Sequence, residues 1–144
     1  MKRILKITAL SVLFLMAFML FSCNFGDAVT YEEATAAISN VFGALGEENY
    51  EAAASFMHPN AESSAEKMQI MAEALQDSGI SFSDRIEIKQ ITNMSQAMYD
   101  SYYGGSSYSL TFVAAFGEKN CTVEAIVVRN AHGFGVHELN FSPN

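Results

Sequence analysis

The chain has 144 residues, half of them apolar, and a formal net charge of −8. Three of its eight basic residues, Lys2, Arg3 and Lys6, stand at the start; without them five basic residues remain against sixteen acidic ones, a net charge of −11. A surface of this sign repels the phosphates of nucleic acid, so nucleic-acid binding is excluded.

The first residues have the layout of a secretory signal. The three basic residues precede an apolar run from Ile7 to Phe21, fifteen residues long, and this order is typical of signal peptides. A membrane-spanning helix needs about 20 apolar residues, so the run is short for a permanent span. Two other interpretations stay open: cleavage after Ala28, which would release a soluble protein, and an uncleaved anchor helix.

The segment ends in Leu20-Phe21-Ser22-Cys23, which resembles a bacterial lipobox. The resemblance implies cleavage before Cys23 and a diacylglyceryl group on its thiol, and two acyl chains give stable anchoring. We therefore predict a lipoprotein signal peptide over residues 1–22, a lipidated cysteine with a short tether over 23–29, and a single domain over 30–144. The expected location is the cell envelope, with the protein held at the membrane and facing away from the cytoplasm.

The domain begins with patterns typical of helices. Thr30 and Glu33 form a capping-box pair, and apolar residues follow at helical spacing until Gly46. A second, short helix is predicted after Asn49 and ends at Pro59. A third is predicted to open at Asn60 and to close at Gly79, with an apolar stripe that consists of Ala61, Ala65, Met68, Ala72 and Leu75.

From residue 81 the apolar period changes to two, which indicates strands. Ile86 and Ile88 alternate with charged residues, whereas Ile91 and Met94 fall out of phase, which predicts a bulge or a strand end. A turn-rich stretch follows, and then strands are predicted over 108–116, 121–129 and 134–141. The predicted class is therefore α+β: three N-terminal helices packed on a curved, four-stranded antiparallel sheet, in a cone-like arrangement.

This order of elements, with the stretch AISNVFGALGEENYEAAASFMHP at residues 37–59, resembles the nuclear transport factor 2-like fold, also called ketosteroid-isomerase-like or cystatin-like. Small bacterial lipoproteins of unknown function within that group are the most similar. The resemblance implies a cone that holds a small molecule, catalyses isomerisation or hydration, or serves as a binding or dimerisation module.

The inward-facing sheet positions carry no obvious acid or base. They are expected to be Ile86, Ile88, Tyr108, Leu110, Phe112, Phe116, Val123 and Val127, whereas an isomerase of this kind needs a carboxylate or histidine inside the cone. The candidate ligand-binding residues are His58, at the exit of the second helix, with Tyr108, Phe112 and Phe116. No CxxC, HExxH or clustered His/Cys pattern occurs, so neither a metal site nor a cofactor is predicted. Cys121 is expected to be buried and inert.

Tyrosines alternate with serine and glycine at residues 98–108. Such mixtures form binding surfaces in antibody paratopes, so Tyr99, Tyr102 and Tyr103 are candidates for contact with a protein or a glycan. The simpler interpretation is a hairpin connection that covers the sheet edge. Together the patterns predict a non-catalytic, lipid-anchored binding or assembly module for a small apolar ligand, a protein partner or a second copy paired through the sheet. The alternative is an isomerase or dehydratase that uses the cone.

Overall fold

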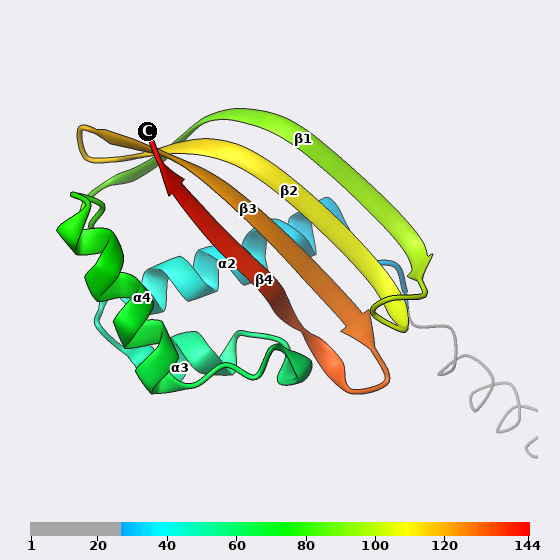
Figure 1. Ribbon diagram of the computed structural model, residues 1–144. Coiled ribbons are helices and arrows are strands. Elements are labelled where there is room, and N and C mark those ends of the chain that lie inside the picture. Colours follow the sequence, from blue (N-terminus) through cyan, green and yellow to red (C-terminus); the bar gives the residue numbers. More distant parts are fainter. Residues whose placement is uncertain (1–26) are drawn as a thin grey trace, which may run out of the picture.

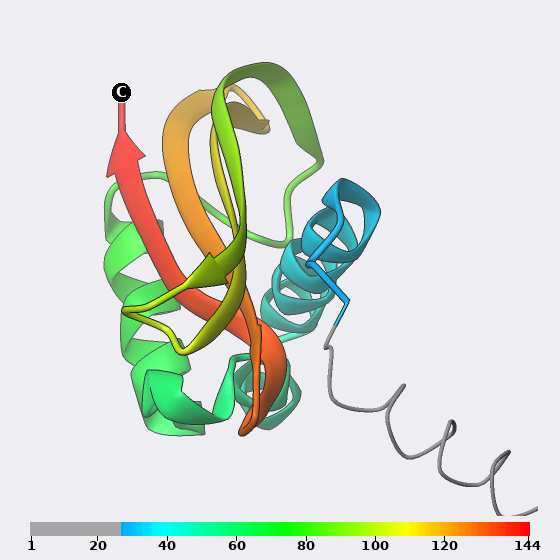
Figure 2. The ribbon, with the colours of Figure 1, turned by 90° about the vertical axis from the view of Figure 1, so that its right-hand side faces the viewer.

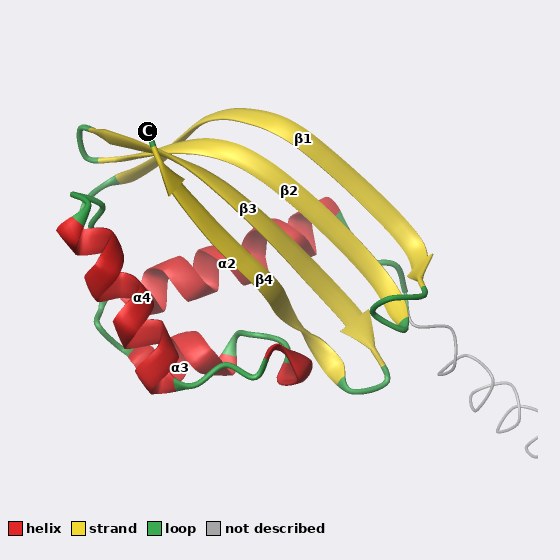
Figure 3. Ribbon diagram, viewed as in Figure 1, coloured by secondary structure: helices red, strands yellow, loops and turns green. Residues whose placement is uncertain are grey.

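The computed structural model describes residues 27–144, so the predicted signal peptide and Cys23 lie outside the described residues. Helices come first and strands follow (Figure 3). The elements are α2 (Tyr31–Gly46), α3 (Tyr50–Ser55), the 3-10 turn η1 (Pro59–Ala61), α4 (Ala65–Asp77), β1 (Ile86–Asp100), β2 (Gly105–Phe116), β3 (Lys119–Asn130) and β4 (Gly133–Pro143). Three helices followed by a four-stranded antiparallel sheet confirm the predicted α+β class.

The sheet is a meander in which each strand pairs with the next, in the order β1-β2-β3-β4. Helix α2 packs beneath β3 and β4, α3 packs on α2, and α4 packs on α3. Figure 1 shows α4 on the side of the sheet where β4 is the edge strand, and Figure 2 shows the strands bending over the helices. The sheet is bent but not strongly curled, so it is more open than the word cone suggests.

Helix α2 begins as its sequence predicts. The Glu33 amide donates to Thr30 Oγ1 over 3.2 Å, and the Thr30 amide donates to Glu33 Oε2 over 3.0 Å. These reciprocal bonds satisfy two amides that the first helical turn leaves free. The buried face of the helix consists of Ala34, Ala37, Ile38, Val41, Phe42, Ala44 and Leu45.

The third helix starts later than predicted. Residues 59–61 form the η1 turn, Glu62 adopts a left-handed conformation with φ 50°, and α4 begins only at Ala65, capped by Ser64. The reason is tertiary: the His58 amide donates to the Val136 carbonyl oxygen over 2.7 Å. This bond draws the chain onto the edge of β4 before a new helix can form.

The first strand is longer than predicted. Its register with β2 shifts between Ile88 and Gln90 and again between Ile91 and Asn93, which confirms the expected bulge. The strand nevertheless continues to Asp100, so the predicted turn-rich loop shrinks to residues 101–104. An edge strand pairs on one side only and is half solvated, so it forms without strict alternation of apolar residues.

The core lies between α2 and the inner face of the sheet, at the positions of β2 and β3 expected from the alternation, whereas Ile88 of β1, which was expected with them, is 54% exposed. Tyr108, Leu110, Phe112 and Phe116 of β2 are buried with Cys121, Val123, Ala125 and Val127 of β3. Phe42 of α2 lies at the centre, where its ring is within 5.5 to 6.5 Å of the rings of Phe82, Phe112, Phe116 and Phe141. This aromatic cluster joins α2 to β2, to β4 and to the segment that leads into β1.

Candidate functional site

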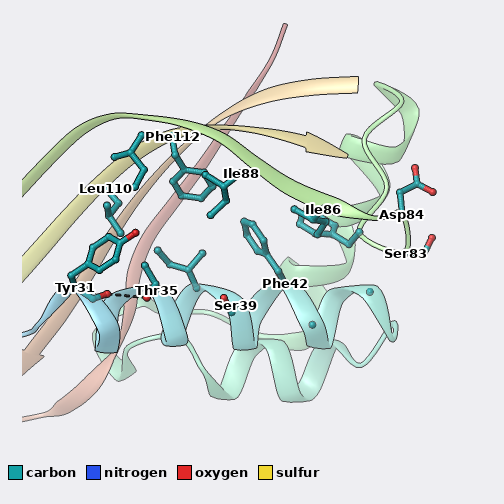
Figure 4. A pocket seen from close by; sticks show the side chains of 15 residues that line it. Tyr31, Thr35, Ser39, Phe42, Ser83, Asp84, Ile86, Ile88, Leu110 and Phe112 are labelled. Carbon is teal, nitrogen blue, oxygen red and sulfur yellow. Dashed lines mark hydrogen bonds between the residues drawn. The ribbon is translucent and has the colours of Figure 1, made fainter. Parts of the chain in front are cut away.

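A cavity of about 520 Å³ lies between helix α2 and the edge strand β1. Its size is within the range of small-molecule pockets, which are usually about 300–1,000 Å³. The lining residues are Tyr31, Thr35, Ile38, Ser39, Phe42, Gly43, Gly46, Phe82, Ser83, Asp84, Ile86, Ile88, Ile91, Leu110 and Phe112. Figure 4 shows the apolar side chains of the sheet facing α2 across this space.

The cavity exists because α2 packs against β3 and β4, which leaves β1 overhanging the other side of the helix. On that side α2 carries the small residues Thr35, Ser39 and Gly43. A Cβ atom at Gly43 would meet no heavy atom within 4 Å, so the space next to the helix is open. Ile88 lines the cavity and is still 54% exposed, so the cavity opens to solvent along β1.

The lining offers little polar chemistry. The Thr35 hydroxyl donates to the Tyr31 carbonyl oxygen over 3.0 Å, and the Ser83 hydroxyl is 2.8 Å from that of Ser81. The single carboxylate is Asp84, which is exposed at the margin, and its oxygens turn away from the cavity (Figure 4). A surface of this kind binds an apolar molecule by burial, and the described residues that line it include no inward-facing carboxylate or histidine for proton transfer.

Of the four predicted ligand-binding residues, one lines this cavity. Phe112 contributes its ring to the wall. Tyr108 and Phe116 lie on the same face of the sheet but outside the lining: the ring of Tyr108 is 6.2 Å from that of Tyr31, and its hydroxyl donates to Met94 Sδ over 3.6 Å. Both side chains therefore belong to the core beside the cavity.

His58 lies away from the cavity and has a structural role. It is 1% exposed, and its Nε2 donates to Asn130 Oδ1 over 3.1 Å and to the Gly133 carbonyl oxygen over 3.2 Å. Its Nδ1 accepts from the Asn60 amide over 3.0 Å. This set of partners requires the neutral ring, and burial lowers the pKa of His58 below its usual value. The histidine fastens the η1 turn to the β3–β4 hairpin.

A second polar cluster joins His58 to His137, Tyr103 and Glu138. The ring of His137 lies between those of His58 and Tyr103, with centroids 5.5 and 4.9 Å away. Tyr103 donates its hydroxyl proton to Glu138 Oε1 over 2.7 Å. Burial and that carboxylate raise the pKa of Tyr103 well above its usual value. The half-buried phenol therefore stays protonated and acts as a hydrogen-bond donor to Glu138.

His137 and Glu138 are neighbours in β4, and regular strand alternation would point them to opposite faces of the sheet. The register shifts between Ile126 and Val127, which leaves His137 unpaired in a bulge. His137 Nδ1 consequently lies 3.9 Å from Glu138 Oε1. A bulge redirects a side chain in this way because two residues oppose one on the neighbouring strand. His132 is exposed in the β3–β4 turn.

The tyrosine-rich segment divides into two kinds of residue. Tyr103 is half-buried against Glu138 and His137, whereas Tyr99 and Tyr102 are 71% and 81% exposed. Only the latter pair is free to contact another molecule.

Sequence reasoning missed Thr35, Ser39 and Gly43, which form the helix side of the cavity. Their spacing of four residues places them in one row along α2, next to the apolar stripe. That row is a signal in the sequence. It becomes a cavity wall only because β1 stands off from it, and this separation is a tertiary property.

Within residues 27–144, no three histidine, cysteine, aspartate or glutamate side chains come together to hold a metal ion. In the same part of the chain, none of the helices has the length and apolar character needed to cross a membrane. Comparison with protein families, with curated proteins and with solved structures finds no match to this chain.

Proposed function

We propose that this protein is a non-catalytic, lipid-anchored module of the cell envelope that binds a small apolar molecule between α2 and β1. The observation that carries the binding proposal is the cavity of about 520 Å³ with its mainly apolar lining. A preformed apolar pocket with few polar groups suits an apolar ligand, because burial supplies the binding free energy.

The anchor rests on the lipobox resemblance at Leu20–Cys23 and on the apolar run that precedes it. Both are features of the sequence outside the described residues. The likeness to lipoproteins with a nuclear transport factor 2-like domain belongs to the same proposal, and the order of helices and strands supports it.

An isomerase or dehydratase is the less supported alternative. Such chemistry needs a general acid or base within hydrogen-bond reach of the bound substrate. Among the described residues that line the cavity, the single carboxylate is Asp84, which is exposed and turned outward, and none of them is a histidine. The buried His58 is engaged with Asn130 and Gly133 elsewhere in the fold.

The binding proposal is tested by filling the cavity. Gly43→Leu adds a side chain where open space adjoins the helix, and Ala36→Leu introduces the same residue at an exposed position of α2 outside the lining. The probe is N-phenyl-1-naphthylamine, an uncharged apolar dye whose fluorescence rises on burial. Wild type and the Ala36→Leu variant are expected to bind it saturably, and Gly43→Leu to lose that binding. Equal binding by both variants, or none by wild type, would refute the proposal.

The anchor is tested by labelling with palmitate in the cells that make the protein. Wild type is expected to incorporate the label and Cys23→Ser to incorporate none, because the acyl chains require the thiol of Cys23. Full labelling of the serine variant would refute the anchor.

A further inference from the structure

The described chain begins at one end of the sheet. The Asp27 carbonyl oxygen accepts from Arg129 Nη1 over 3.0 Å, and the Val29 amide donates to Ser106 Oγ over 3.3 Å. Ser106 and Arg129 are paired beside the β1–β2 and β3–β4 hairpins. These bonds hold residues 27–29 at the end of the molecule where both hairpins turn (Figure 1).

The predicted lipid attachment site is close to this point along the chain. Cys23 precedes Asp27 by four residues, and an extended chain spans at most about 3.6 Å per residue, or about 14 Å in all. A lipid on Cys23 therefore holds the hairpin end of the domain within that distance of the bilayer. The hairpin end is therefore the part of the described domain that the anchor holds nearest to the bilayer.

The same end carries the most exposed large apolar side chains of the described residues. Met98, Tyr99 and Tyr102 are 73%, 71% and 81% exposed. We call these three residues the hairpin tip. The ring of Tyr102 packs edge-on against that of Tyr103, with centroids 4.9 Å apart, and Tyr103 is held by Glu138. The tip is thus oriented by a fixed ring beneath it. Tyrosine is enriched where one part of a side chain meets hydrocarbon and another meets water.

The charged side chains near the hairpin tip are few, and those described here are hydrogen-bonded or ion-paired. Asp100 accepts from the Tyr102 amide over 2.9 Å and from the Ser107 hydroxyl over 3.4 Å, and Arg129 is paired with Glu33 over 2.8 Å. No lysine stands in residues 90–118 or 120–144. Contact between the hairpin tip and a membrane would therefore depend on burial of the apolar side chains and not on attraction to anionic head groups.

We propose that the hairpin tip inserts into the interfacial layer of the bilayer to which the protein is anchored. This inference rests on the proposed lipid anchor. The docked domain has a defined orientation: Tyr31, the first residue of α2, is near the membrane, and Gly46 is roughly 22 Å further along the helix at 1.5 Å per residue. The cavity between α2 and β1, which is lined from Tyr31 to Gly46 of this helix, therefore extends from the membrane-proximal end toward the aqueous side.

The chain contains no tryptophan, so a single introduced tryptophan reports its own surroundings. Tyr102→Trp places it at the hairpin tip, and Ile70→Trp places it at an exposed position of α4, away from the hairpins (Figure 1). Both are made in the full, lipidated protein and reconstituted in phosphatidylcholine vesicles with brominated acyl chains. Emission at position 102 is expected to shift to shorter wavelength and to lose most of its intensity. Emission at position 70 is expected to match that in lipid without bromine.

The remaining outcomes separate the docking from the anchor. A lipidated protein whose tryptophan at position 102 is not quenched overturns the docking and leaves the anchor standing. A protein without acyl chains overturns both. Quenching that appears only when phosphatidylglycerol is added contradicts insertion by apolar burial. A position 102 that is shielded in native envelope membranes but unquenched in pure lipid shows that the tip contacts a protein or glycan, and it too overturns the docking.

Discussion

Arg129 of β3 and Glu33 of α2 form an ion pair, with 2.8 Å between Arg129 Nη2 and Glu33 Oε1. The same carboxylate closes the capping box at Thr30, and the same guanidinium lies 4.8 Å from the ring centroid of Phe134. The pair therefore ties the start of α2, the chain at Asp27 and the β3–β4 hairpin into one unit. The pair therefore fixes the end of the domain to which the chain before Asp27 is attached.

Arg129→Gln is expected to lower the free energy of unfolding by about 1 kcal/mol, because it removes a half-exposed ion pair and a cation–π contact. Urea denaturation monitored by circular dichroism measures the change. Lys89→Gln is the matched control, since the Lys89–Glu87 pair lies at the surface and such pairs contribute little. Equal losses in the two variants would contradict a special role for Arg129.

The contribution of Glu33 is also expected to depend on pH. Hydrogen bonds from Arg129 and from the Thr30 amide lower the pKa of Glu33 in the folded protein. The pair therefore stabilises the fold above the unfolded pKa of about 4.3, and this stabilisation is lost as the pH falls through the lower folded value. The difference in urea midpoint between wild type and Arg129→Gln should shrink from about pH 7 to about pH 3. A constant difference would contradict this.

Gly43 and Gly46 lie one turn apart in α2 and are expected to respond in opposite directions to alanine. Gly43→Ala should raise the free energy of unfolding by about 0.5–1 kcal/mol, because the Cβ has open space and alanine favours the helix. Gly46→Ala should lower it, because the Cβ would lie 2.7 Å from the Phe82 carbonyl oxygen. Thermal and urea denaturation check both. A stable Gly46→Ala variant would show that the packing of residues 82–83 on α2 is looser than described.

His58→Ala is expected to lower the free energy of unfolding by about 2 kcal/mol or more, because it leaves a buried space and unpaired groups at Asn130 and Gly133. His132→Ala, at an exposed position, serves as the control and should be neutral.

The contribution of His58 is also expected to depend on pH, because its pKa is lower in the folded protein than in the unfolded chain. Below about pH 6.5 the unfolded chain binds a proton at His58 that the folded protein does not bind, so the free energy of unfolding of wild type should fall. The alanine variant should lose this part of the pH dependence, and an unchanged profile would assign it to other groups.

Cys121 is expected to be unreactive in the native protein. Its side chain is fully buried, and burial raises the pKa of its thiol, so little thiolate is present and no reagent reaches it. A lipidated protein should therefore show no thiol toward Ellman's reagent when folded and one per chain in urea. A second, readily reactive thiol would be that of Cys23 and would contradict the thioether at that position.

The helices and the three later strands follow from local pattern. The capping box at Thr30 and Glu33 and the apolar stripe of α2 are interactions within one helix, so the sequence determines them without reference to the sheet. Regular alternation in β2 and β3 has a similarly local meaning, because one face of each strand is buried along its whole length. The sequence also contains the tyrosines and small residues from which the candidate sites are made.

The sequence did not determine the features that depend on contacts between segments distant along the chain. The docking of His58 on β4 delays the start of α4 to Ala65, and pairing with β2 carries β1 on to Asp100. A bulge in β4 turns His137 toward Glu138. The cavity arises because α2 follows β3 and β4 while β1 stands apart. Local patterns are set by each segment's own period, whereas registers, bulges and empty space are set by the distances between segments, which exist only in the folded chain.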